Sequence, residues 1–164
     1  MPSHKIPTNP LRRKKEGKTN YKKRLGILKG GIPRLVVRKF NKNVIAQIIT
    51  YNAKGDKVEA QAHSKELEKY GWKESRNNVP ASYLVGMLLA KKTKIKEAIL
   101  DAGLQKPTKG SRIYSTVKGC IDGGMKIPHD AEGFPKIERI TGKHIQGKDL
   151  EKTFNETKEK IIKS

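Results

Sequence analysis

Polar and apolar residues alternate along three consecutive segments in the first part of the chain, a pattern typical of half-buried β-strands. Turn-forming Asn and Gly residues separate the segments, which are Arg34–Phe40, Val44–Tyr51 and Lys57–His63. In the third segment, small apolar residues occupy every second position and therefore share one face. The pattern predicts an antiparallel meander with one apolar face, which suits a sheet that is covered by helices on one side only.

The middle of the chain combines helical periodicity with one further strand. A strongly apolar helix is predicted to begin at Pro80 and to run to about Thr93. The short apolar segment Ala98–Asp101 follows it, and the usual right-handed crossover predicts that this strand pairs in parallel with the sheet. A second core helix should begin after Ser111, which we expect to cap it, and should end at Gly123–Gly124.

Shorter elements surround this core. Short helices are predicted at four places: 18–29, Ser64–Tyr70, 136–142 and about 148–162. Residues 125–136 are predicted to form a loop. Residues 1–17 contain three Pro residues and a run of four cations, so we expect this segment to be disordered in isolation.

Positive charge is concentrated at the N-terminal end. Lys and Arg number 37 against 16 Asp and Glu, which gives a formal net charge of +21. Through residue 45 there are fourteen cations and one acid, Glu16, whereas the last nineteen residues are nearly balanced. Such a concentration of like charge repels itself and favours a densely anionic partner. Nucleic acid is the first candidate, and an anionic membrane surface is the second.

These patterns predict an α/β fold of the two-layer α+β kind. Its small mixed sheet is built from an antiparallel three-strand meander plus a parallel strand, with helices on one face and a basic N-terminal arm. We expect three parts: a basic, RNA-binding arm with a short helix (1–31), an α/β core domain (32–134) and a short helical C-terminal extension (135–164).

The sequence contains no motif typical of an enzyme or of a metal site. The four His residues are scattered, the residue order of a P-loop is missing, and the single Cys120 excludes an internal disulfide and a Cys-rich zinc site. We therefore expect no catalytic residue, no metal, no cofactor and no small-molecule substrate. The longest apolar run is far too short for a membrane span, and the N-terminus lacks the apolar stretch of a signal peptide.

The residues favour recognition of RNA through its backbone and shape. Aromatic residues make up 5% of the chain, and the RRM, KH and zinc-finger patterns are missing. The basic run, the amide-rich hairpin and a basic helix start supply the candidates Arg12, Arg13, Lys14, Lys15, Arg34, Arg38, Asn41, Lys42, Gln47, Lys109 and Arg112, and Tyr21 in the predicted helix 18–29 is a candidate for base stacking. Each candidate also has an alternative explanation. The basic run could be a solvated tail or a nuclear-import-like signal, the hairpin cations could be edge-strand charges that prevent aggregation, and Tyr21 could pack against its own helix.

Several blocks of the chain occur in an order known from one protein family. These blocks are Pro33–Lys39, Asn41–Gln47, Ala62–Leu67, Tyr70–Trp72, Asn78–Gly86, Gly110–Arg112, Asp122–Gly124 and Ile127–His129. Together they resemble the ribosomal protein L-eighteen family in its archaeal and eukaryotic branch. The likeness runs from about residue 10 to Ile145, which is most of the chain.

The resemblance implies a structural constituent of the large ribosomal subunit, without catalysis. A member of this family binds 5S rRNA and helps to attach it to the large-subunit rRNA in the central protuberance. The implied partners are 5S rRNA, large-subunit rRNA and neighbouring large-subunit proteins, and the implied location is cytoplasmic and ribosome-bound. By position, the resemblance adds Asn20 and Arg24 to the candidate RNA-binding residues.

The rival hypothesis from another functional class is an RNA-processing enzyme, such as a metal-dependent nuclease, on a similar α/β sheet. Such an enzyme would need clustered carboxylates to hold its metal ions. The central Asp residues available for that purpose are Asp56, Asp101, Asp122 and Asp130, and each has an alternative explanation in a turn or at a helix end.

Overall fold

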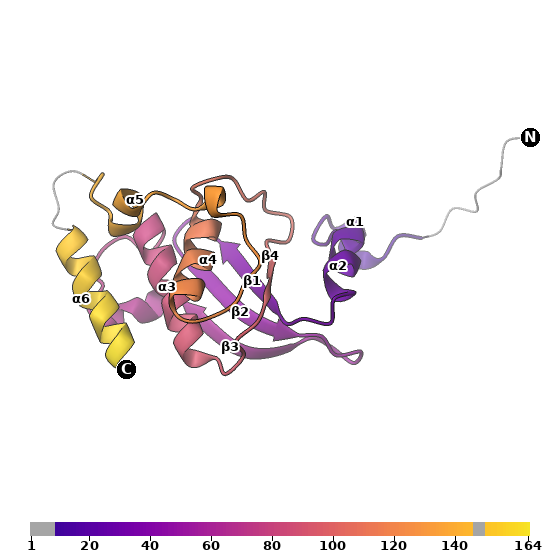
Figure 1. Ribbon diagram of the computed structural model, residues 1–164. Coiled ribbons are helices and arrows are strands. Elements are labelled where there is room, and N and C mark those ends of the chain that lie inside the picture. The colour runs from indigo at the N-terminus through magenta and orange to yellow at the C-terminus, as the bar shows by residue number, and fades with distance from the viewer. Residues whose placement is uncertain (1–8, 146–149) are drawn as a thin grey trace, which may run out of the picture.

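A four-stranded mixed sheet lies at the centre of the fold (Figure 1). The computed structural model describes residues 9–145 and 150–164. The strands follow the order β3-β2-β1-β4, with both meander pairs antiparallel and β4 parallel to β1. Their bounds are Arg34–Lys39 for β1, Val44–Thr50 for β2, Lys57–His63 for β3 and Ile99–Asp101 for β4. The predicted meander and its parallel strand are confirmed.

The two core helices cover one face of this sheet. They are α3 (Val79–Lys92) and α4 (Arg112–Asp122). Leu35 lies opposite Ile48 in the β1–β2 register, and both side chains are fully buried on the covered face. The other face of the same strands carries Arg34, Arg38 and Gln47 together with apolar Val36 and Ile49, so it is mixed and not polar throughout.

The two core helices touch each other at glycines. A Cβ atom on Gly86 would lie 2.1 Å from the Thr116 carbonyl oxygen, and one on Gly119 would lie 2.0 Å from the Tyr83 carbonyl oxygen. These separations are shorter than any van der Waals contact, so only hydrogen fits at either position. Ser115 Oγ strengthens the same contact by donating to the Val79 carbonyl at 2.7 Å.

The smaller elements extend the core. The segment Ser64–Tyr70 forms a 3-10 helix, η1, and is followed by Gly71 in a left-handed conformation. Two C-terminal helices pack against α3, and Phe154 and Ile161 of the second one join the main apolar core. These C-terminal helices are α5 (Ile137–Thr141) and α6 (Leu150–Lys163). A 3-10 turn, η2 (Ala131–Gly133), lies between α4 and α5 in the chain. The predicted start of the last helix, at 148, lies outside the described residues.

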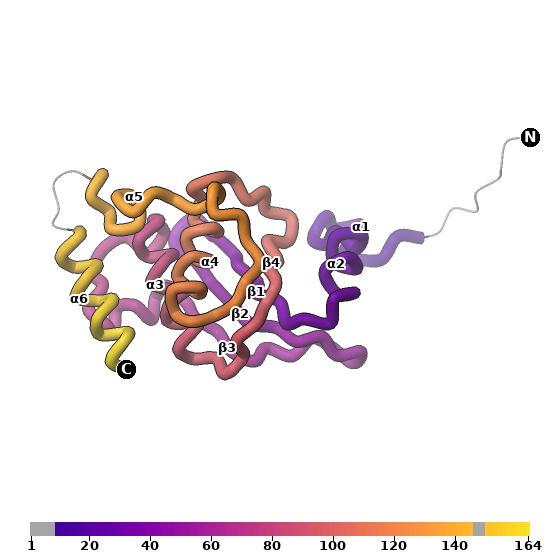
Figure 2. Tube along the Cα trace, viewed as in Figure 1, coloured from indigo at the N-terminus to yellow at the C-terminus, as the bar shows by residue number. Residues whose placement is uncertain are grey.

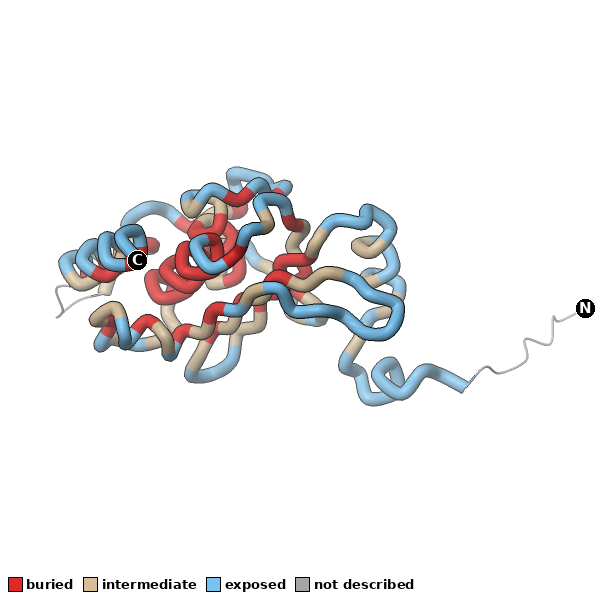
Figure 3. The backbone as a smooth tube through the Cα atoms, turned by 90° about the horizontal axis from the view of Figure 1, so that it is seen from below, coloured by how far each residue is buried: buried red, intermediate tan, exposed pale blue. Residues whose placement is uncertain are grey.

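Residues 9–31, the described part of the arm, add two short helices and no buried residue: α1 (Arg12–Lys15) and α2 (Tyr21–Leu28). The prediction of disorder across 1–17 is wrong for α1, because local backbone bonds close a helical turn there without any burial. Residues 1–8 of the same prediction lie outside the described residues. Figure 2 traces the arm at the end of the molecule opposite α6, and Figure 3 shows that most of it is exposed while buried residues concentrate around α3 and α4.

One capping prediction needs correction. Ser111 occupies the N-cap position of α4, but its side chain makes no capping hydrogen bond. Its Oγ is buried and finds no partner among the described residues. The amide of Ser111 instead donates to the Thr108 carbonyl, which closes the loop that precedes the helix.

Candidate nucleic-acid interface

The arm and the uncovered face of the sheet enclose a cleft of about 210 Å³. Val36 and Ile49 form part of its sheet side. Six cations and two carboxylates line the cleft, for a formal charge of +4: Arg13, Lys18, Lys23, Arg24, Arg34, Arg38, Asp56 and Asp101. A concave surface of this charge attracts an anion such as an RNA phosphate. Among the predicted site residues, the fold brings together Arg13, Asn20, Arg24, Arg34, Arg38 and Gln47.

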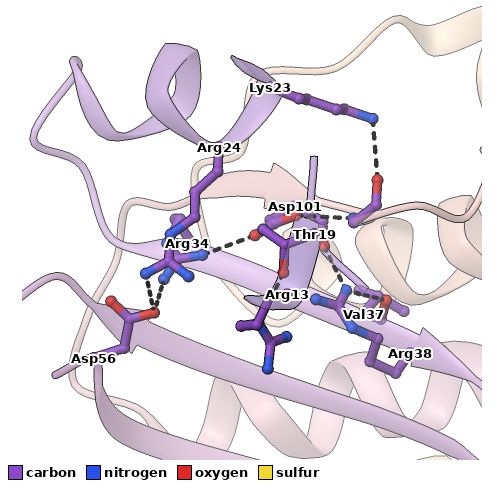
Figure 4. A network of polar contacts seen from close by, with 10 residues as sticks. Arg13, Thr19, Lys23, Arg24, Arg34, Val37, Arg38, Asp56 and Asp101 are labelled. Carbon is purple, nitrogen blue, oxygen red and sulfur yellow. Dashed lines mark hydrogen bonds and ion pairs between the residues drawn. The ribbon is translucent and has the colours of Figure 1, made fainter. Parts of the chain in front are cut away.

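Arg34 differs from the exposed cation expected on an RNA-facing strand. Its side chain is 5% exposed, because the arm and the β2–β3 turn cover this end of the strand. Its Nη2 donates to Asp56 Oδ2 at 2.6 Å, and its Nη1 donates to Asp101 Oδ2 at 2.8 Å (Figure 4). In the free protein Arg34 therefore joins parts of the fold and does not face solvent.

Arg38 and Gln47 lie farther along the same face and remain partly exposed. Arg38 Nη1 donates to the carbonyls of Val37 and Asp101 at 3.1 and 3.2 Å, which fixes the direction of the guanidinium group. Burial lowers the pKa of Arg38, although an arginine stays charged at neutral pH. A guanidinium has five N–H donors, so this anchored group still has donors to offer to a ligand in the cleft.

The turn between β1 and β2 forms a second surface with different neighbours. Asn41 and Lys42 are exposed there and line a shallow hollow together with the loop from Trp72 to Asn77. The side-chain amide of Asn77 donates to the Asn41 carbonyl, which fixes the turn against this loop. The residues that the sequence assigned to one arm-and-hairpin surface are thus divided between two.

The predicted phosphate site at the start of α4 is largely occupied by protein groups. Lys109 Nζ pairs with Glu132 at 2.7 Å, with both side chains well exposed. The amide of Gly110 donates to the Gly133 carbonyl of η2 at 2.9 Å. Arg112 Nη1 donates to the carbonyls of Phe40 and Asn77, at 3.4 and 3.1 Å. Lys109 therefore stays accessible, whereas Arg112 supports the β1–β2 turn from behind.

The other predicted arm residues lie on its exposed side. The cations of α1 are all exposed: Arg12, Arg13, Lys14 and Lys15. Tyr21 is half-buried and borders a small hollow beside Leu104, a position compatible with packing and with base stacking. Asn20 Oδ1 accepts from the Lys23 amide at 3.1 Å and so caps α2.

The carboxylates that a metal-dependent nuclease would need are dispersed. Asp56 and Asp101 pair with an arginine, Asp130 caps η2, and Asp122 accepts from the Tyr83 hydroxyl at 2.7 Å. Burial, together with the bond to Asp122, raises the pKa of Tyr83, so this hydroxyl remains a donor. Within residues 9–145 and 150–164, no three His, Cys, Asp or Glu side chains gather in a way that could hold a metal ion.

Four charged residues of the cleft were missed by the sequence reasoning. Lys18 and Lys23 belong to the basic N-terminal region, so its charge could have identified them, and Lys23 Nζ donates to the Gly103 carbonyl at 3.5 Å. Asp56 and Asp101 had no such signal, because their common partner, Arg34, is 22 and 67 positions away in the chain.

In the described part of the chain, no helix is both long and apolar enough to cross a membrane.

The chain is similar to known proteins over most of its length. The model of the family described as "Ribosomal large subunit proteins 60S L5, and 50S L18" matches residues 8–97 and 92–130. The large ribosomal subunit protein uL18 of Korarchaeum cryptofilum (strain OPF8) is 51% identical over 138 residues, which make up 82% of this chain and 71% of the relative. The family match includes the described arm, the whole sheet and both core helices.

Proposed function

The chain belongs to the family of ribosomal large subunit proteins 60S L5 and 50S L18, and from this premise we propose that it binds 5S rRNA and helps to attach it to the large-subunit rRNA in the central protuberance. Membership makes the chain a structural protein of the large ribosomal subunit, whose partners are rRNA and other ribosomal proteins. Our proposal goes further: it names 5S rRNA as the direct ligand and assigns the residues that contact it.

The observation that carries the proposal is the cleft between the arm and the sheet. Six cations from the arm and from β1 converge on it, against two carboxylates. Because five of the six cations lie on helices or strands, they present a fixed pattern of charge to the backbone of a structured RNA. A solvated basic tail would offer charge without such a pattern.

We assign the proposed RNA contacts to the two surfaces described above. The first surface comprises the cleft residues Arg13, Asn20, Arg24, Arg38 and Gln47, joined by Lys18 and Lys23, together with Arg12, Lys14, Lys15 and Tyr21 elsewhere on the arm. The second comprises Asn41, Lys42 and, beyond the turn, Lys109. Arg34 and Arg112 support these surfaces from within the fold.

The same proposal covers the organisation of the chain. The arm (1–31) supplies most of the RNA-binding charge, the core (32–134) holds the arm and the turn in place, and the C-terminal extension (135–164) packs on the core. The protein acts without catalysis, cofactor or metal, as a ribosome-bound component of the cytoplasm.

Crosslinking in cells tests the proposal directly. The tagged protein is crosslinked to RNA in its own cells, recovered under denaturing conditions, and the attached RNA is sequenced. We expect 5S rRNA to dominate, with a smaller contribution from large-subunit rRNA. A pool made up of large-subunit rRNA alone would overturn the assignment of 5S rRNA as the ligand.

Purified components provide the matching measurement. We expect the protein to bind folded 5S rRNA more tightly than an unstructured RNA of equal length. If eight phosphates are contacted, log affinity should fall against log salt with a slope of about −6 to −7. Equal affinity for both RNAs would show that the protein recognises charge alone.

A further inference from the structure

Two carboxylates connect the arm to the sheet through one buried arginine (Figure 4). Asp56 Oδ2 accepts from Arg24 of α2 at 2.9 Å and from Arg34 of β1 at 2.6 Å. Arg34 then reaches Asp101 Oδ2 at the end of β4 at 2.8 Å. Asp101 Oδ1 accepts from the Gly103 amide at 2.8 Å. A helix of the arm is thereby linked to the β2–β3 turn and to both strands of the parallel pair, β1 and the edge strand β4.

A second hydrogen bond connects α2 to the loop that follows β4. Lys23, the residue before Arg24, donates to the Gly103 carbonyl at 3.5 Å. Gly103 belongs to the loop whose amide Asp101 holds, so one turn of α2 meets both ends of the network. Since no residue of α2 is buried, these polar contacts replace the apolar packing that normally docks a helix.

Burial makes the centre of the network rigid. The Arg34 side chain is 5% exposed and that of Asp101 is 11% exposed, whereas Asp56 and Arg24 are 24% and 32% exposed. A buried ion that loses its partner remains desolvated and uncompensated, which is strongly unfavourable. The inner pair therefore holds its geometry, and the outer carboxylate, Asp56, carries the connection to the arm.

We propose that Asp56 is a positioning residue, held by the Arg34–Asp101 pair, which docks α2 on the sheet before RNA arrives. The inference rests on the proposed function, because its purpose is to present the arm cations to RNA in a fixed arrangement. An arm that is already docked loses less conformational entropy on binding than a free one. RNA affinity therefore depends on a carboxylate that carries the same sign of charge as the ligand.

The direction in which RNA affinity changes when the Asp56 carboxylate is removed distinguishes a positioning role from a simple charge effect. Removing a carboxylate from a surface that binds a polyanion should strengthen binding if only the total charge matters. If Asp56 positions the arm, the isosteric change Asp56→Asn should weaken binding, because α2 is released. The matched control is Glu59→Gln on neighbouring β3, which removes one negative charge from a carboxylate that contacts Thr50 and Lys57 of the same hairpin and no residue in the described part of the arm.

The test combines hydrogen exchange of the free full-length protein with affinity for folded 5S rRNA. For Asp56→Asn we expect amide exchange in residues 21–28 to rise at least tenfold while α3 is unchanged, and RNA affinity to fall about threefold to tenfold. Glu59→Gln should leave exchange unchanged and RNA affinity equal or slightly higher. Asp56→Glu keeps the carboxylate and should restore most of both properties.

Two results would overturn the inference: unchanged exchange in α2 for Asp56→Asn, or unchanged or increased RNA affinity despite faster exchange. The first would show that Asp56 does not dock the arm, and the second that docking is irrelevant to RNA. Exchange is measured without RNA, so it decides the docking question even if the wild-type protein fails to bind 5S rRNA. That last result would count against the proposed function and not against docking.

Discussion

The two faces of β1 are held by opposite kinds of interaction. Leu35 and Val37 are fully buried in an apolar core under α3 and α4. Their sequence neighbours Arg34 and Arg38 lie on the opposite face, toward the arm. Arg34 is held by two carboxylates, and Arg38 is held by backbone carbonyl oxygens. Apolar burial is non-directional and scales with area, whereas a charged contact depends on the position of single atoms.

This difference separates stability from binding within one small protein. The apolar core under α3 and α4 contains no residue of α1 or α2, so we expect its packing not to depend on the arm. The arm keeps its cations accessible, because only a few directional contacts attach it to the sheet. Changes in the core should therefore alter unfolding, and changes in the arm should alter RNA binding.

The largest expected effect comes from a methyl group placed between the core helices. Gly119→Ala should lower the free energy of unfolding by about 3 kcal/mol, because the new Cβ would overlap the Tyr83 carbonyl and force α3 and α4 apart. Urea denaturation of the free protein measures the loss. Gly26→Ala is the control inside α2, where no atom lies within 4 Å of the new Cβ, so stability should stay equal or rise slightly. Similar losses for both variants would remove the distinction between the two regions.

Removal of residues 1–17 should produce the next largest effect, on RNA and not on folding. Five cations and one acid are lost with this segment, so affinity for 5S rRNA at low salt should fall about 100-fold, or about 2.8 kcal/mol. The dependence of log affinity on log salt should become shallower by about 4. Binding titrations at several salt concentrations, with matched thermal melts, check both expectations. A large drop in the melting temperature would show that α1 contributes to the core.

A smaller effect is expected at Arg112, which connects core helix α4 to the β1–β2 turn through hydrogen bonds. Arg112→Ala should reduce the free energy of unfolding by about 1.5 kcal/mol, because the carbonyls of Phe40 and Asn77 lose a charged donor. Lys109→Ala, three residues earlier, removes an exposed ion pair with Glu132 and should stay within about 0.5 kcal/mol of wild type. Chemical denaturation of both variants gives the comparison. A loss as small for Arg112 as for Lys109 would mean that the turn does not need its support.

Salt should produce the smallest effect and should act on the arm alone. An increase from about 0.1 M to about 1 M shortens the Debye length from about 10 Å to about 3 Å. The partly exposed Arg24–Asp56 pair is then weakened by about 0.5 kcal/mol, so amide exchange in α2 should rise about twofold. Exchange in α3 should not change, since that helix is held by apolar contacts. Parallel increases in both helices would indicate a general effect of salt on the fold.

Much of the fold could be predicted because its signals are local. The period-two pattern of the meander and the apolar helix after Asn78 depend on neighbouring residues, and the structure places these elements where the sequence predicts them. The concentration of charge near the N-terminus is likewise a property of consecutive residues. Local signals also misled in two places. The basic run forms a helical turn, and Ser111 stands at the N-cap without using its side chain.

The candidate site could be predicted only in outline. The basic region and the hairpin were identifiable from composition, but their division into an arm cleft and a separate turn surface was not. The roles of Arg34 and Arg112 were not visible either, because an arginine in the sequence looks the same whether it faces solvent or holds a carboxylate.

The sequence by itself therefore determined which segments are strands and helices, which face of each is apolar, and where positive charge accumulates. Tertiary structure alone decided which charges meet. Arg24, Arg34, Asp56 and Asp101 lie far apart along the chain and come together only when β4 pairs beside β1 and α2 folds back over the sheet. Periodicity is set by backbone geometry within a few residues, whereas the partner of a charge depends on how distant strands are brought into register.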